Sequence, residues 1–256
     1  MLSDTVAFVT GASQGIGRAV AISLADQGAS VALAARSDGI YETADLIGDD
    51  SRTLPIETDV TEEAVVEAAI EETVEEFGGL DCMVANAGIG RPTKNVEEVT
   101  VEEFQHVQDV NVLGTFLCTK HAGPHLRASD RGSVIAISSA SAKRPHPMRT
   151  PYTASKAAQI TIMRAVAHEM GPEDVTANTV CPGPVAGDRI ERVWQAAADY
   201  LDVPVEAVEE EMKSDMPLDE IVPPEEIGEM VAYLAGPHAR HITGQAINVN
   251  SGIAVY

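Results

Sequence analysis

The chain has 256 residues, 45% of them hydrophobic, and carries 40 acidic against 17 basic side chains for a formal net charge of −23. That length suits one large domain with an ample core. So strong a negative field excludes nucleic acid and anionic membrane surfaces as partners. Because it shows neither a secretory signal nor an apolar run of about eighteen residues, we expect a cytoplasmic protein with no membrane span.

The balance of charged residues is itself unusual, since only five of the bases are lysines. Many carboxylates with few lysines are typical of proteins adapted to high salt, where screening relieves self-repulsion. Cys82, Cys118 and Cys181 are far apart in apolar surroundings. Since neither the cysteines nor the scattered histidines have metal-ligand spacing, we expect reduced thiols in the core and no metal site.

The first predicted element is a strand at 6–9, followed by the run T-G-A-S-Q-G-I-G at 10–17 and a helix with one apolar stripe. Gly11, Gly15 and Gly17 allow positive φ and the close approach of a ligand. The free N–H groups that begin the next helix attract an anion. The stretch predicts a pyrophosphate cradle, with the alternative of a tight turn that needs glycine for packing only.

Strands and helices alternate along the rest of the chain. Further buried strands are predicted at 30–35, 53–58, 80–85, 133–138, 176–180 and 245–249. Helical patterns between them cover about 61–77, 101–126 and 152–170. Such a pattern indicates a parallel sheet covered on both faces. We predict one doubly wound, Rossmann-type α/β domain over 1–256 with about seven parallel strands, whose ligand lies at the carboxyl ends of the strands.

Four polar or turn-forming groups lie at the carboxyl ends of predicted strands. They are Asp59, Asn86, Ser138 with Ser139, and the pair Pro182–Gly183. Because the carboxyl ends of parallel strands share one edge of the sheet, we expect these groups to converge there.

Tyr152 and Lys156 are four residues apart in a helix and therefore share one face. A nearby ammonium lowers the pKa of a phenol, which otherwise titrates near ~10, and turns it into a usable base. The alternative is a surface aromatic beside a lysine. Ser139 either hydrogen-bonds a substrate carbonyl or caps a turn, and Asn111 either bends its helix or holds a water in a proton relay.

Together these motifs resemble those of the short-chain dehydrogenase/reductase family over nearly the whole chain. The resemblance implies that Tyr152 is the general acid/base and that Lys156 lowers its pKa and binds the nicotinamide ribose. It also implies that Ser139 orients the carbonyl and that Asn111 anchors a relay water. The chain departs from the family at Val185, near which a threonine is common, and at Ala85, where a second asparagine is common.

The same resemblance implies a set of cofactor contacts. They are Gly11, Ser13, Gln14, Gly15, Ile16, Gly17, Arg36, Asp59, Val60, Asn86, Ala87, Gly88, Tyr152, Lys156, Pro182, Gly183 and Val185. Arg36 stands at the end of the second strand, where its guanidinium would grip a 2′-phosphate, so NADP is favoured over NAD. The alternative is an arginine that stacks on adenine in an NAD enzyme.

Basic residues cluster in three loops expected to overhang this site. They are Lys143, Arg144, His146 and Arg149, then Arg91 and Lys94, and finally Arg189 and Arg192. They predict an anionic substrate, such as a keto acid, a sugar acid or a phosphorylated carbonyl compound; alternatively they pair with surface acids or a neighbouring subunit. The substrate candidates are Arg144, His146, Arg149, Arg189 and Trp194. Residues 187–223 are expected to cover the substrate, with Trp194 and Tyr200 as candidate pocket or packing aromatics.

The predicted function is therefore an NAD(P)-dependent oxidoreductase that interconverts an alcohol and a carbonyl, with a sugar, sugar acid or other anionic carbonyl compound as substrate. A 3-oxoacyl-(acyl-carrier-protein) reductase is the main alternative. A catalytically silent dinucleotide-sensing regulator would have lost Tyr152 or Lys156, and an epimerase or dehydratase would add a larger C-terminal region. The resemblance also implies a homodimer or homotetramer formed through the helices at 101–126 and 152–170.

Overall fold

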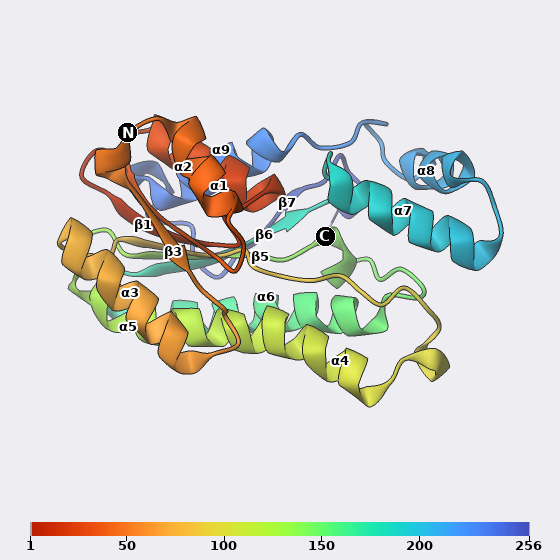
Figure 1. The fold of residues 1–256 in the computed structure, drawn as a ribbon, viewed down its shortest axis with the longest axis horizontal. Helices are drawn as coiled ribbons and strands as arrows, with labels where there is room; N and C mark the ends of the chain where they lie inside the picture. Colours follow the sequence, from red (N-terminus) through yellow and green to blue (C-terminus); the bar gives the residue numbers. More distant parts are fainter. Residues whose placement is uncertain (1, 256) are drawn as a thin grey trace.

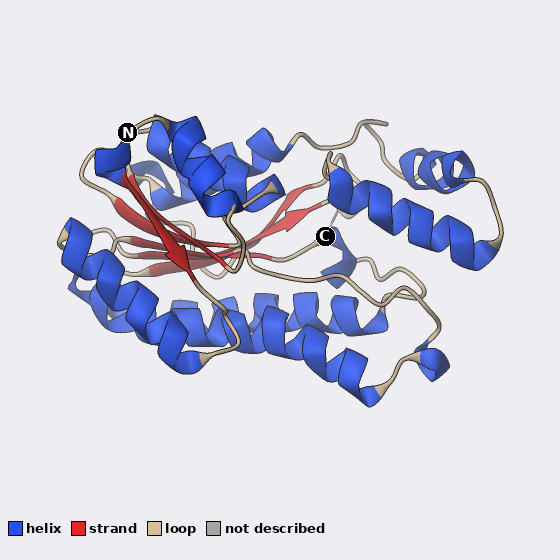
Figure 2. Ribbon diagram, in the orientation of Figure 1, coloured by secondary structure: helices blue, strands red, loops and turns tan. Residues whose placement is uncertain are grey.

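The apolar runs of the sequence form the strands of one parallel sheet at the centre of the molecule (Figure 2). The computed structural model describes residues 2–255. The spatial order is β3-β2-β1-β4-β5-β6-β7, and every pairing is parallel. The strands are β1 (Val6–Thr10), β2 (Ser30–Ala35), β3 (Thr53–Glu57), β4 (Cys82–Ala85), β5 (Ser133–Ile137), β6 (Thr176–Pro182) and β7 (Ala246–Val249). The predicted doubly wound fold with seven parallel strands is confirmed.

Helices cover both faces of this sheet (Figure 1). One layer contains α1 (Gly15–Asp26), α2 (Gly39–Ile47) and α9 (Pro224–Ala235). The opposite layer contains α3 (Glu63–Phe77), α4 (Val101–Gln108), α5 (Gly114–Ala128) and α6 (Thr150–Met170). Each layer buries its own apolar cluster against the strands. The helices α2 and α9 were not among the predicted elements.

The helix predicted over 101–126 is interrupted. Between α4 and α5, residues Asp109–Leu113 form a π-helical turn that contains Asn111. The side chain of Asn111 is tied to the backbone of Ile89, beyond the end of β4. Such π-turns often occur at functional sites. This turn fixes Asn111 at the carboxyl edge of the sheet.

The segment 187–223 forms an arm of two helices, α7 (Asp188–Leu201) and α8 (Val205–Ser214), that projects beyond the carboxyl ends of the strands (Figure 1). Its root is a short parallel bridge between Val185 and Val222. The N–H of Val222 donates to Pro184 O at 2.9 Å, and the N–H of Ala186 donates to Val222 O at 3.0 Å. The arm therefore leaves and rejoins the sheet beside the end of β6.

The three cysteines are free thiols, and all are buried, as expected. Within residues 2–255, none of the helices combines the length and the apolar character that crossing a bilayer requires.

Candidate active site

The glycine loop after β1 packs closely against its neighbours on one side and leaves space for a ligand on the other. A Cβ on Gly11 would lie 2.8 Å from Asn86 Nδ2, and one on Gly17 would lie 2.1 Å from Gly11 O. These two glycines are therefore needed for close packing. Gly15 differs: its φ is +54°, and nothing lies within 4 Å of the Cβ it lacks. The loop combines the two alternatives, with Gly15 at its open side.

The beginning of α1 fits a pyrophosphate. Gln14 is its N-cap residue, but its side chain makes no capping hydrogen bond, and the first turn holds no acidic residue. The N–H groups of a helix start that lacks a side-chain cap suit an anion. Arg18 holds the loop by donating to Ser13 O at 2.6 Å. Ser13 is buried and Ile16 is half-buried.

Asn86 holds the glycine loop in place. Its Nδ2 donates to Thr10 O at 2.8 Å and to Gly11 O at 3.2 Å, while the backbone N–H groups of Asn86 and Ala87 both donate to Thr10 Oγ1 at 3.0 Å. Both donors of the Asn86 amide are thus used within the protein. The backbone of 86–88, rather than this amide, is what remains to face a ligand.

Arg36 and Asp59 form an exposed pair beyond β2 and β3. Arg36 Nη1 lies 3.4 Å from Asp59 Oδ2. The other carboxylate oxygen, Oδ1, accepts from the N–H of Thr61 at 2.9 Å and from its hydroxyl at 2.8 Å. Partial burial would raise the pKa of Asp59, but the Thr61 bonds and the Arg36 charge lower it below its ordinary value. Val60 turns away and packs against Gly114 at the beginning of α5.

Tyr152 and Lys156 lie in the first turns of α6, and both are buried. Lys156 Nζ is 5.8 Å from the centre of the Tyr152 ring. The two serines after β5 contact different residues. Ser138 Oγ donates to Lys156 O at 2.7 Å, and Ser139 hydrogen-bonds Tyr152. Ser139 Oγ also accepts from Ser141 N at 3.1 Å, so it caps a turn and approaches the phenol at once.

The surroundings of the phenol favour its ionised form. Burial would raise the pKa of Tyr152, but the positive charges of Arg189, Lys156 and Arg149 and the hydrogen bond with Ser139 lower it to about 8. Burial lowers the pKa of Lys156 to about 8 as well, against the opposing effect of the phenolate. Two groups that titrate together near neutral pH are typical of acid/base catalysis.

A buried network connects Lys156 to Asn111 through Gln159. Lys156 Nζ donates to Ile137 O at 2.8 Å and to Gln159 Oε1 at 3.0 Å. Gln159 Nε2 donates in turn to Asn111 O at 3.1 Å and to Thr115 Oγ1 at 2.7 Å. The amide of Gln159 thus joins Lys156 to Asn111 directly, and the relay water predicted beside Asn111 stays a prediction. Gln159 was missed, although a glutamine three residues after Lys156 on a helix was a usable signal.

The Asn111 amide is equally saturated. Its Oδ1 accepts from Ile89 N at 2.8 Å, and its Nδ2 donates to Ile89 O at 2.9 Å and to Ser155 Oγ at 2.8 Å. A Cβ on Gly88 would lie 3.0 Å from that Oδ1 and 3.4 Å from Lys156 Nζ. The backbone at 88–89 therefore passes directly over the network.

The Pro182–Gly183 turn forms the neighbouring wall. Gly183 N donates to Val249 O at 3.0 Å, and a Cβ on Gly183 would lie 2.8 Å from Asn250 Cα. The close approach explains the glycine. Val185 is half-buried and pairs with Val222 at the root of the arm.

The predicted substrate residues separate into two groups. Arg149 and Arg189 lie over the ring of Tyr152, with Cζ 4.5 and 5.8 Å from its centre. Arg144 instead pairs with Asp215 at 2.8 Å. The half-buried His146 follows it, and its pKa is lowered by burial and then by the charges of Arg144 and Arg149.

Of the two roles predicted for Trp194, pocket or packing, the structure shows packing. The side chain is buried, and its Nε1 donates to Met212 Sδ at 3.3 Å, so it packs α7 against α8. Tyr200 is exposed at the end of α7, where its hydroxyl donates to Glu98 Oε2 at 2.8 Å and accepts from Asn95 Nδ2 at 2.6 Å. Both aromatics position the arm.

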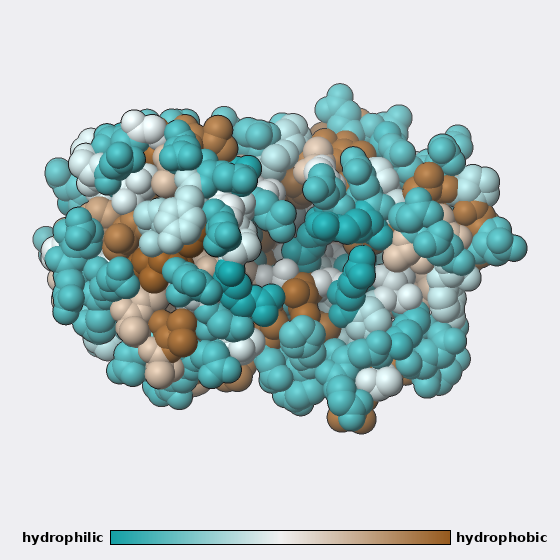
Figure 3. Space-filling view, in the orientation of Figure 1, coloured by the Kyte–Doolittle hydropathy of each residue, from teal (hydrophilic) through white to brown (hydrophobic). Residues whose placement is uncertain are grey.

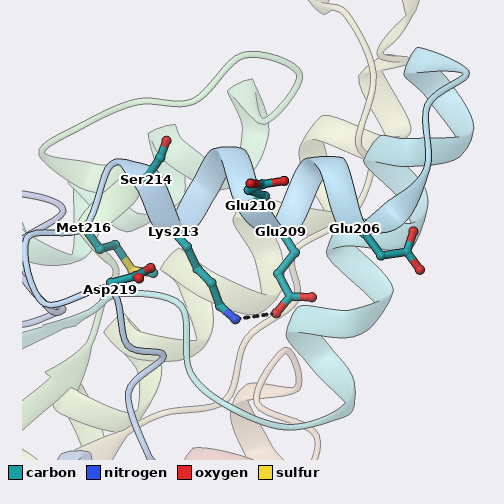
Figure 4. Close-up of a pocket in the computed structure, with 7 residues that line it drawn as sticks. All are labelled: Glu206, Glu209, Glu210, Lys213, Ser214, Met216 and Asp219. Atoms are coloured by element: carbon teal, nitrogen blue, oxygen red, sulfur yellow. Dashed lines mark ion pairs between the residues drawn. The ribbon is translucent and has the colours of Figure 1, made fainter.

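Figure 3 shows the surface hollowed beside the arm, with hydrophilic side chains around the hollow. A separate cavity of about 580 Å³ lies on the arm itself (Figure 4). It is lined by Glu206, Glu209, Glu210, Lys213, Ser214, Met216 and Asp219. Its one lysine, Lys213, is paired with Glu209 at 2.6 Å. This lining is mainly acidic and holds none of the predicted catalytic residues, so the cavity is separate from the candidate site around Tyr152.

Comparisons with known proteins agree with this geometry. The family model described as Enoyl-(Acyl carrier protein) reductase matches residues 11–254. A short-chain dehydrogenase/reductase of Armillaria gallica is 38% identical over 253 residues, which cover 97% of this chain and 95% of that protein. The cis-4-hydroxycyclohexanecarboxylate dehydrogenase of Sinomonas cyclohexanicum is 32% identical over 256 residues, with 98% and 96% covered.

Among solved structures, the 3-ketoacyl-(acyl-carrier-protein) reductase from Brucella melitensis complexed with NADH superimposes with a TM-score of 0.87. The two are 30% identical, and all of both chains is covered. The strand order and the glycine loop define a doubly wound dinucleotide-binding fold. The chain belongs to the short-chain dehydrogenase/reductase family, whose enzymes act on CH–OH and carbonyl groups with a nicotinamide dinucleotide.

Proposed function

We propose that this enzyme interconverts a small-molecule alcohol and its carbonyl with Tyr152 as general acid/base. The observation that carries the proposal is the buried phenol whose pKa is lowered to about 8 by neighbouring cations. In reduction, Tyr152 Oη gives its proton to the carbonyl oxygen; in oxidation, the phenolate takes the proton of the alcohol. The nicotinamide, when bound, supplies or accepts the hydride.

The other members of the predicted tetrad act through position. Ser139 donates a hydrogen bond that orients the carbonyl oxygen beside Tyr152. Lys156 stabilises the phenolate, and since an ammonium has three donors and two are bound by Ile137 and Gln159, one remains for a ribose hydroxyl. Asn111 fixes the backbone at Ile89 over the site. In this proposal the arm of residues 187–223 covers the bound substrate.

The test is a turnover screen against sugars, sugar acids and 3-oxoacyl thioesters, in low and in molar KCl. Turnover is measured by the change in nicotinamide absorbance. We expect oxidation or reduction of at least one class. Cofactor binding without turnover of any class would contradict the proposal and favour a dinucleotide sensor.

We also propose NADP as the preferred dinucleotide, held at its 2′-phosphate by Arg36. An exposed guanidinium stands beyond β2, and its partner Asp59 is already bound by Thr61. Replacing Arg36 by alanine should raise the KM for NADP by about ten- to a hundredfold, the loss of a charge-assisted bond. The KM for NAD serves as the control, and an equal change in both would favour stacking on adenine.

For the substrate we favour a sugar, a sugar acid or another anionic carbonyl compound. The similarity to a dehydrogenase named for a hydroxycyclohexanecarboxylate supports an acid. The similarity to a 3-ketoacyl-(acyl-carrier-protein) reductase supports the alternative, a 3-oxoacyl thioester. The thioester arm of the screen separates the two.

We propose self-association through α4 and α5, as a dimer or tetramer. Phe104 in α4, Leu113 in the π-turn and Phe116 in α5 are exposed, with 40%, 39% and 50% of their surface accessible, and an interface between subunits would cover apolar side chains of this kind. Light scattering should give a multiple of the 27.0 kDa chain mass. Phe116→Asp should shift the protein to a smaller species, and a wild-type monomer would end the proposal.

We further propose that the protein is adapted to high salt within a reducing cytoplasm. A net charge of −23 and three buried free thiols support this. The melting temperature should rise by several degrees between low and molar KCl, because screening relieves repulsion among the acids. A flat or falling curve would contradict the proposal.

A further inference from the structure

Arg149 is half-buried beside the catalytic phenol and has no acidic partner. Its Nε is inaccessible and has no hydrogen-bond partner. Among residues 2–255, six arginines form no ion pair, and Arg149 is the one of these that is not exposed. An inaccessible guanidinium N–H without an acceptor, on a charge without an acid beside it, is costly. In a chain with 40 acids, that cost indicates a partner that is not part of the protein.

Arg189 reaches the same place from the arm. Its Nη1 donates to Gly88 O at 3.3 Å, a long hydrogen bond to an uncharged acceptor. A Cβ built on Gly90 would lie 3.0 Å from Arg149 Nη2 and 3.3 Å from Arg189 Nη2. The two guanidinium groups, here called the arginine pair, therefore converge beside the backbone at Gly90 and over the Tyr152 ring.

Neighbouring basic side chains behave differently. Arg144 binds Asp215, and Lys94 binds Glu103 at 2.8 Å. Lys143 Nζ donates to Ala246 O at 2.7 Å and to Asn248 Oδ1 at 2.8 Å. These three bases have partners within the protein, whereas the arginine pair contacts no acid.

We propose that Arg149 and Arg189 bind a carboxylate of the substrate, so that the enzyme acts on hydroxy acids and oxo acids. This inference rests on the proposed role of Tyr152. A planar guanidinium group matches the two oxygens of a carboxylate. Two guanidinium groups together offset the free energy that the carboxylate loses when it leaves water. The pair lies against the phenol itself, so the carboxylate lies within a few bonds of the reacting carbon. The phosphate of a carrier-bound thioester is many bonds from its carbonyl and does not fit this position.

The test compares two hydroxy acids, cis-4-hydroxycyclohexanecarboxylate and 3-hydroxybutyrate, with their methyl esters. We expect kcat/KM to favour at least one acid over its ester by tenfold or more. Arg189→Gln and Arg149→Gln should reduce that preference about ten- to a hundredfold. Arg164→Gln is the matched control, since it removes an exposed, unpaired arginine from α6 and should leave the preference unchanged.

Malonate binding, measured by calorimetry, gives a readout independent of turnover. Arg189→Gln should weaken it by a similar factor, and because Arg189 is exposed, this variant carries the test if Arg149→Gln fails to fold. Equal use of acids and esters, or the same loss in Arg164→Gln, would overturn the arginine pair and leave the oxidoreductase intact. Malonate binding that depends on Arg189, without turnover of any probe, would instead keep the anion site and refute the proposed function.

Discussion

Two groups of side chains surround Tyr152 and differ in how their polar atoms are satisfied. In the buried network of Asn111, Thr115, Lys156 and Gln159, both amides use every donor and their acceptor oxygen. In the arginine pair, Arg149 Nε has no partner, and Arg189 has one weak contact with a backbone carbonyl. Saturated groups hold a geometry, whereas unsatisfied groups beside a reactive atom are available to a ligand. We infer that the network positions the catalyst and that the arginine pair receives the substrate.

The phenol shared by both groups gives the largest expected effect. Tyr152→Phe removes the proton that is transferred, so kcat should fall by about 10³-fold. The dissociation constant of the dinucleotide, measured by fluorescence, should stay within a factor of about two. A variant that keeps near-normal kcat would show that neither group serves a catalytic tyrosine.

The network is tested next by Gln159→Leu, which keeps the volume and removes the bridge. Lys156 would then keep Ile137 O as its one protein partner, and kcat should fall by about tenfold. The unfolding free energy should fall by about 1–3 kcal/mol, because a buried ammonium loses an acceptor. Thr115→Val is the matched control: it removes another partner of Gln159 without touching Lys156. If it lowers kcat equally, the network acts through stability alone.

The pH profile sharpens the comparison further. Alcohol oxidation needs the phenolate, so kcat/KM should rise with pH and level off above about 8, while carbonyl reduction should decline there. The inflection belongs to the coupled pair of Tyr152 and Lys156. Arg189→Gln removes a positive charge that stabilises the phenolate, so it should move the inflection to higher pH. An unmoved inflection would mean that Arg189 does not act on the phenol.

The smallest effect is expected at the far end of the arm. Tyr200 contacts Glu98 and Asn95 at the surface, where exposed hydrogen bonds contribute little. Tyr200→Phe should raise the substrate KM by about twofold and leave kcat unchanged in steady-state assays. A change as large as that of Gln159→Leu would show that closure of the arm, and not the network, limits the reaction.

The sequence predicted those features that local patterns encode. Continuous apolar runs predicted β1, which precedes the glycine loop, and the six strands that follow it. The four-residue spacing predicted that Tyr152 and Lys156 share one face of α6. The predictions failed where long-range contacts decide. The amide of Gln159 finds Asn111 only after α6 packs on the π-turn, and Arg144 finds Asp215 only after α8 folds back. The sequence left Trp194 open between a pocket and a packing role, because nothing local shows that α8 covers it.

The most direct test of this division of roles is the ratio of kcat/KM for a hydroxy acid over that for its methyl ester, measured in three proteins. The ratio should be high in the wild type and unchanged in Gln159→Leu, although that variant is slower. It should collapse in Arg189→Gln, which loses far more activity toward the acid than toward the ester. Equal ratios in all three proteins, or an equal decrease in both variants, would contradict the account.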